Sequence, residues 1–150
     1  MMGYLTAGLK KAALAFALVF ALETLSHADE LSALQTLADQ GHASAQFALG
    51  TIYFDGLRVK RDVPEALAWW QRAANRGSLD AQFALGNIYS GGYGVRRDRI
   101  LAYAWFDIAA SKSSDDWFRI IAGSNRDAVA ANMTPAEIAD AKALVAKRSN

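Results

Sequence analysis

Apolar side chains recur along most of the chain at the three- and four-residue spacing that is typical of amphipathic helices. A first helix is predicted over residues 43–54, where the apolar positions are Phe47, Leu49, Ile52 and Tyr53. A second helix is predicted over 65–76, because Asp62 followed by Glu65 three residues later is typical of a helix N-cap. Residues 43–76 are therefore predicted to form a hairpin of two helices.

The same hairpin is predicted again 36 residues further along the chain, over 79–112. The hexapeptide AQFALG occupies residues 45–50 and returns unchanged at 81–86, and 18 of the 36 aligned positions in 41–76 and 77–112 are identical. A period of this length is typical of stacked-repeat proteins, in which each unit buries its apolar face against its neighbours. We therefore predict an all-α fold.

Weaker copies of the pattern flank the two repeats. Residues 29–40 resemble the second half of a repeat, since Leu31 and Ala38 align with Leu67 and Ala74, and they are predicted to form an N-terminal capping helix. The predicted single domain is 29–150, with the capping helix at 29–40, repeats at 41–76 and 77–112, and a degenerate repeat with a C-terminal cap at 113–150.

Two helices are predicted in this degenerate end. Asp115 and Asp116 are candidate caps for the first, and Thr134 with Glu137 forms a capping box for the second, which starts at Pro135. Its charged outer side is the polar face expected of a terminal cap.

Residues 1–28 have the three parts of a secretory signal. Two lysines precede an uninterrupted apolar run over 12–22, which is too short to cross a bilayer, and the small residues Ser26 and Ala28 follow it. Cleavage is expected before Asp29, so the protein is predicted to be exported, to the periplasm, with no transmembrane span afterwards. An uncleaved anchor or a buried helix is the alternative.

Three stretches together resemble the Sel1-like repeat family, a relative of the tetratricopeptide repeat. They are the AQFALG hexapeptide, the loop GYGVRRD at 92–98 and AYAWF at 102–106. The resemblance implies a short right-handed superhelical solenoid of antiparallel helix hairpins, and it implies adaptor or regulator roles in protein complexes. One departure is that the family's second loop glycine, present as Gly94, is Arg58 in the first repeat, so the first loop is expected to differ.

Composition narrows the possible chemistry. The 150 residues carry a formal charge of only +1, so nucleic acid is not an expected partner, and there is no cysteine. His42 is the one histidine after the predicted cleavage point, and metal sites need several ligands. Asp62 and Asp98 invite comparison with paired catalytic carboxylates, but their identical place before each second helix favours capping. No catalytic, metal or cofactor site is predicted, and the chain is not expected to be an enzyme.

Partner-binding residues are sought where the two repeats differ, since matching positions are expected to pack against each other. One candidate surface lies on a single face of the first helices and consists of Ser44, Thr51, Phe54, Asp55, Asp80, Asn87 and Ser90. The alternative is an ordinary solvated face. A second candidate is a basic loop edge that would attract an anionic envelope component, formed by Arg58, Lys60, Arg61, Arg96, Arg97 and Arg99.

The aromatic residues are expected mainly in the core. Trp69 and Trp105 share one repeat position beside alanines, and Trp70 and Phe106 follow them. Trp117 and Phe118 lie outside the repeats and are expected to close the core, with an exposed docking edge as the alternative.

The sequence therefore predicts a non-enzymatic protein–protein interaction module of the bacterial cell envelope, which binds an unidentified protein through a concave helical surface. A cell-wall or polysaccharide-directed hydrolase or binding protein is the alternative, and a purely structural subunit is a third.

Overall fold

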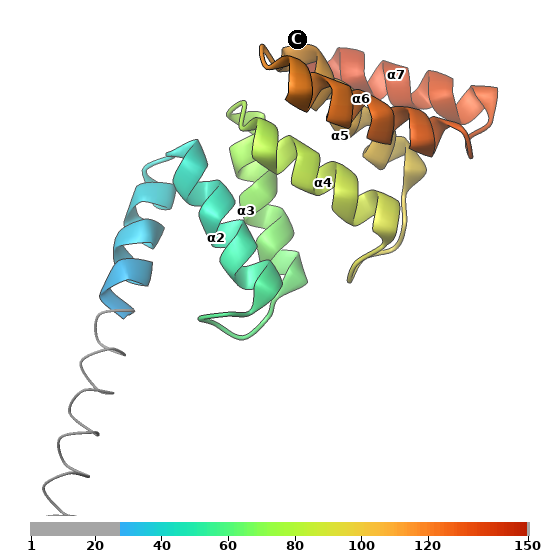
Figure 1. Ribbon diagram of the computed structural model, residues 1–150. Helices are drawn as coiled ribbons and strands as arrows, with labels where there is room; N and C mark the ends of the chain where they lie inside the picture. The colour runs from blue at the N-terminus through green and yellow to red at the C-terminus, as the bar shows by residue number, and fades with distance from the viewer. Residues whose placement is uncertain (1–27, 150) are drawn as a thin grey trace, which may run out of the picture. The chain divides into compact units, whose positions relative to one another are not determined.

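The computed structural model describes residues 28–149, and all the regular secondary structure in that range is helical (Figure 1). A first helix covers 28–39, and it is followed by α2 (Ala43–Asp55), α3 (Val63–Asn75), α4 (Leu79–Gly91), α5 (Arg99–Lys112), α6 (Asp116–Ala130) and α7 (Pro135–Ser149). The predicted all-α fold of helix hairpins is confirmed. The predicted signal segment falls, except for Ala28, outside the described residues.

The chain divides into two compact units, Met1–Thr36 and Leu37–Asn150. The described residues of the first unit, 28–36, are helical. The second unit contains α2 to α7 and every surface discussed below. None of the helices in the described range is long and apolar enough to cross a membrane.

Within the second unit, α2 packs on α3 and α4 packs on α5 as two hairpins, and α3 packs on α4 to join them. The second helices begin one period apart because an aspartate caps each of them. The Asp62 carboxylate accepts a hydrogen bond from the Glu65 backbone N–H at 3.0 Å, and that of Asp98 accepts one from Leu101 at 2.9 Å. Both predicted N-caps are confirmed.

Buried glutamines tie α2 and α4 to the end of the helix that precedes each of them. The Gln82 side-chain amide donates to the Ala74 carbonyl at 3.1 Å, and Gln46 makes the same bond to Ala38 at 2.9 Å. Trp70 and Trp105 lie in the main hydrophobic cluster together with Leu85. The predicted burial of the repeat tryptophans is confirmed, since Trp69, Trp70 and Trp105 are all buried.

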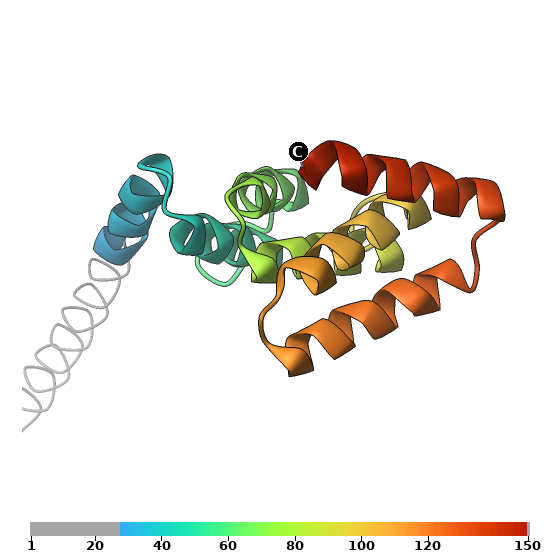
Figure 2. The same cartoon turned by 90° about the horizontal axis from the view of Figure 1, so that it is seen from above.

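The hairpin pattern stops at α6. Both α6 and α7 pack on α5 and lie on two sides of it (Figure 2). Between α6 and α7 themselves there is at most a slight contact in the described residues. Gly123 follows the N-cap Asp115 by eight residues, as Gly50 follows His42 and Gly86 follows Ser78. Trp70 and Phe106 pack against Gly50 and Gly86, whereas nothing lies within 4 Å of a Cβ placed on Gly123.

The sequence of α7 explains this change of partner. One period after Phe106 the chain has Lys142, which cannot supply the aromatic side chain that a second helix presents to its first helix. Instead α7 buries Ala141 and places the Arg148 guanidinium 4.5 Å from the centre of the Trp105 ring. The C-terminal helix therefore covers α5 and leaves the outer side of α6 open.

The two inter-helix loops differ as predicted. Gly94 has a φ of +82°, while no non-glycine residue in the described range has a positive φ, so Arg58 takes another backbone conformation.

Candidate interaction surface

The candidate surface is best described by counting from the N-cap of each first helix. Residues two, nine, twelve and thirteen positions after the cap share one side of an α-helix. On α2, α4 and α6 these positions are Ser44, Thr51, Phe54 and Asp55, then Asp80, Asn87, Ser90 and Gly91, then Trp117, Ser124, Asp127 and Ala128. We call this set the first-helix face. None of its members is buried.

An aromatic hollow of about 380 Å³ lies between α2 and α4 on this face. It is lined by Phe54, Trp70, Ala84, Asn87, Ile88, Ser90 and Tyr93. The rings of Phe54 and Trp70 have centroids 5.2 Å apart, and the Trp70 indole N–H donates to the Phe47 carbonyl at 3.2 Å. These contacts hold the apolar walls in place, while Tyr93 at the rim is 61% exposed.

An arginine hollow of about 320 Å³ adjoins it between α4 and α6. Its lining is Asn87, Ser90, Arg97, Arg99, Phe106, Asn125, Ala128, Val129 and Asn132. No lining residue is acidic, although Arg99 has Glu137 at 3.8 Å. Asn87 and Ser90 line both hollows, so the two adjoin at α4.

The structure therefore joins part of each predicted site. Asn87 and Ser90 from the groove prediction stand in one hollow with Arg97 and Arg99 from the basic-edge prediction. Phe54 lines the aromatic hollow but not the arginine hollow. The remaining groove residues lie on the first-helix face but line neither hollow: Ser44, Thr51, Asp55 and Asp80.

The other loop cations are placed differently. Lys60 and Arg61 line a separate depression that reaches Gly94 of the next loop, whereas Arg58 and Arg96 line neither hollow of the first-helix face. The Arg61 side chain folds back, with Nε donating to the Phe54 carbonyl at 2.8 Å and the guanidinium 5.2 Å from the Phe54 ring centre.

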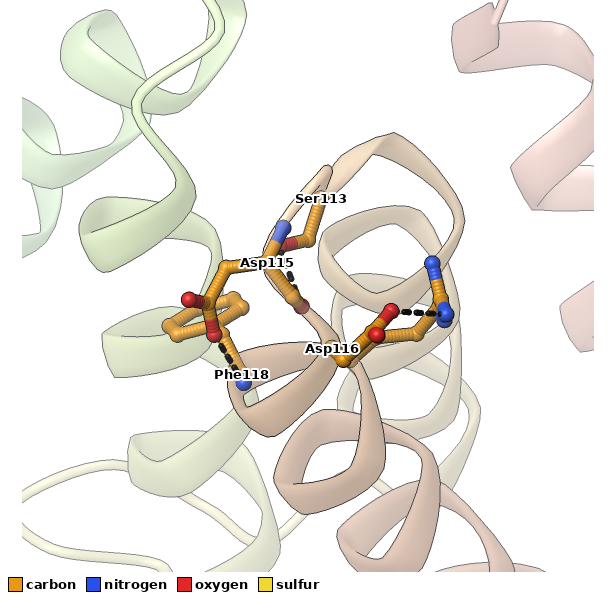
Figure 3. Close-up of polar contacts among 5 residues, drawn as sticks. Ser113, Asp115, Asp116 and Phe118 are labelled. Atoms are coloured by element: carbon orange, nitrogen blue, oxygen red, sulfur yellow. Dashed lines mark hydrogen bonds and ion pairs between the residues drawn. The ribbon is translucent and has the colours of Figure 1, made fainter.

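The prediction that Trp117 closes the core is wrong, because its side chain is 71% exposed. Figure 3 shows why the first turn of α6 is fixed: Asp115 accepts from the Phe118 backbone N–H at 2.7 Å, and the Ser113 hydroxyl is bonded to the backbone of Asp115. The cap stands one residue later than a strict 36-residue period requires. Phe118 consequently turns inward to Phe83, with ring centroids 5.6 Å apart, and Trp117 takes the outward position of Ser44 and Asp80.

If positions in α6 are counted from its N-cap instead of by the 36-residue period, the sequence alone places Trp117 at an outward position. The contribution of Asn125, Ala128 and Asn132 was also missed, because it depends on where α6 packs.

The candidate metal ligands considered from the sequence can be compared with the structure. Residues 28–149 contain no group of three or more histidine, cysteine, aspartate or glutamate side chains able to hold a metal ion. His42 is the N-cap residue of α2, with no side-chain bond to that helix.

Comparison with known proteins identifies the repeats. The Sel1 repeat family matches residues 43–78 and 79–114. A protective antigen of uropathogenic Escherichia coli strains, which displays an SLR fold, is 33% identical with a TM-score of 0.71, over 79% of this chain and 24% of its own. A Sel1 repeat protein from Oxalobacter formigenes is 35% identical with a TM-score of 0.53, over 55% of this chain and 63% of its own. No functionally curated protein matches the sequence. The chain thus spans about a quarter of the antigen's length.

Proposed function

Since this chain is a Sel1-repeat protein, we propose that it is an exported interaction module of the bacterial cell envelope, which binds a protein partner on the first-helix face. Sel1 repeats generally mediate protein–protein interactions, and proteins of this family are typically non-catalytic scaffolds. The role proposed is that of an adaptor, scaffold or regulator.

The observation that supports this face most directly is the pair of adjoining hollows that share Asn87 and Ser90. Residues of α2 to α6 and of the loop between α4 and α5 contribute to these hollows, and among them Tyr93, Arg97 and Arg99 are exposed to solvent. Exposed Trp117 lies on the same face, and tryptophan is among the residues enriched at the energetic centres of protein interfaces.

Site-specific crosslinking in cells tests the proposal. A photoreactive residue in place of Asn87 should capture a defined protein, and the same residue in place of Ala68, which is exposed on α3 and lines neither hollow, serves as the matched control. Equal capture at both positions, or none at Asn87 in a folded protein, would contradict the proposal.

The proposed export rests on the N-terminal signal pattern. N-terminal sequencing of the protein recovered from the envelope fraction should start at Asp29. A start at Met1 in that fraction would assign the segment to an anchor, and recovery from the cytoplasm alone would overturn the localisation.

A further inference from the structure

We propose that the ligand of the first-helix face is a peptide segment that carries a carboxylate for the arginine hollow and a bulky apolar side chain for the aromatic hollow. This inference rests on the proposed function and specifies its partner.

The positive charge of the arginine hollow favours a carboxylate in the ligand. Arg97 and Arg99 are its only ionic lining residues, and the salt bridges between described residues include none to Arg97. Glu137 stands 3.8 Å from Arg99, which leaves Arg97 as the uncompensated cation. A guanidinium offers a planar set of donors that matches a carboxylate in two-point geometry.

Amide side chains line the same hollow as this cation. Asn87, Asn125 and Asn132 each carry donors and an acceptor, which is what a peptide backbone requires on both sides of an anchored residue, although the Asn132 amide also donates to the Ala128 carbonyl at 3.3 Å. The Ser90 hydroxyl already donates to the Asn87 backbone carbonyl at 3.1 Å, so its oxygen remains available as an acceptor.

The walls of the aromatic hollow favour an apolar side chain in the ligand. Apart from Asn87 and Ser90, its walls are the apolar or aromatic side chains of Phe54, Trp70, Ala84, Ile88 and Tyr93. Its volume of about 380 Å³ exceeds that of a Leu, Phe or Trp side chain. Because the hollows share two lining residues, the carboxylate and the apolar side chain should be about two to four residues apart in an extended segment, at roughly 3.3 Å per residue.

These features favour a peptide over an anionic polysaccharide. An anionic polysaccharide would pair its charge with Arg97. It would, however, bury hydroxyl groups against the apolar walls of the aromatic hollow, where they would lack hydrogen-bond partners.

The test is selection of peptides from a displayed random library on the full chain. Enriched peptides should combine Asp, Glu or a free C-terminal carboxylate with a large apolar residue at a constant short spacing. Their affinity, measured by fluorescence polarisation, should fall about five- to tenfold in Arg97→Glu and at higher salt. Tyr93→Ala should also weaken peptide binding, because Tyr93 lines the aromatic hollow. The variant should fold, since Tyr93 is exposed and its loss does not disturb the core. Arg96→Glu, outside the hollow, is the matched control.

Three results would overturn the inference: enrichment without the two side-chain types, equal affinity of Arg97→Glu and Arg96→Glu, or Arg97-dependent binding of alginate with no peptide binding. Arg97-dependent dimerisation in sedimentation velocity would assign the face to a second copy instead. Capture of a protein from Asn87 together with any of these results would leave the proposed function standing and remove only the ligand chemistry.

Discussion

The Phe106 ring occupies the place where Gly86 lacks a side chain. A Cβ on Gly86 would lie 2.6 Å from Cδ1 and Cε1 of that ring, closer than carbon atoms can approach. Gly50 stands in the same relation to Trp70, and the equivalent Gly123 of α6 faces open space. The glycine that ends each AQFALG hexapeptide is therefore the contact point of a hairpin.

We expect Gly86→Ala to lower the free energy of unfolding by about 1–3 kcal/mol, because α4 must move away from Phe106. Urea denaturation followed by circular dichroism measures this change. Gly123→Ala is the internal control and should be neutral or stabilise by up to about 1 kcal/mol through helix propensity. If both substitutions destabilise equally, the open side of α6 is covered in solution and the description of the broken hairpin fails.

Three of the four tryptophans should be protected from a quencher in solution, and one should be accessible to it. Trp69, Trp70 and Trp105 are 3–5% exposed, while Trp117 is 71% exposed. Iodide should therefore quench one component of the fluorescence, and Trp117→Phe should abolish that component with a change in unfolding free energy within about 0.5 kcal/mol. Trp105→Ala, as the comparison, should cost about 3–5 kcal/mol. An unquenchable wild-type protein would mean that Trp117 is already covered by a partner copy.

Much of the fold is encoded in residues that act locally, and for that reason it was predictable. Asp62 and Asp98 fix the starts of α3 and α5 through bonds three residues away, and the identical hexapeptides pack in identical surroundings. The path of α7 was not predictable in the same way. It follows from the absence of an aromatic residue at Lys142, and that absence becomes informative only once Gly50 and Gly86 are known to receive Trp70 and Phe106.

The candidate surface was predicted only in part. Comparison of the repeats found Asn87 and Ser90, because positions that do not pack are free to vary. The basic loops were predicted as a separate edge, because no sequence pattern reveals that Arg97 and Arg99 share a hollow with Ser90 of α4. Trp117 was misplaced because a one-residue shift of the cap rotates every following side chain by about 100° around the helix.

The ion pair between Arg126 and Asp107 should stabilise the packing of α6 on α5. The two side chains are 29% and 24% exposed, with Nη1 2.8 Å from Oδ1, and the hydrogen bonds to Asp107 and Asp127 raise the pKa of Arg126. Arg126→Met should cost about 1–3 kcal/mol in chemical denaturation, since Asp107 is left half-buried without its partner.

Arg119→Met provides the matched comparison for this pair. Arg119 bonds only to Asp116 within the same helix, and both side chains are mostly exposed, so its loss should change the unfolding free energy by less than about 0.5 kcal/mol. Adding Asp107→Asn to Arg126→Met should recover part of the loss. Equal costs for the two arginine variants would show that the α5–α6 contact depends on apolar packing alone.

The capping box at the start of α7 should make stability depend on acid pH. The Thr134 backbone N–H donates to the Glu137 carboxylate at 2.7 Å, and this bond, followed by the Thr134 hydroxyl and the charge of Arg99, holds the pKa of Glu137 below its ordinary value. A lowered folded-state pKa contributes stability that is present above the ordinary value and is lost as the pH falls through the folded one. Thermal unfolding across that window should show a fall in Tm that is smaller in Glu137→Gln than in the wild type. Asp140→Asn, on the same helix and exposed, should keep the wild-type slope; an unchanged slope in Glu137→Gln would show that the box does not form in solution.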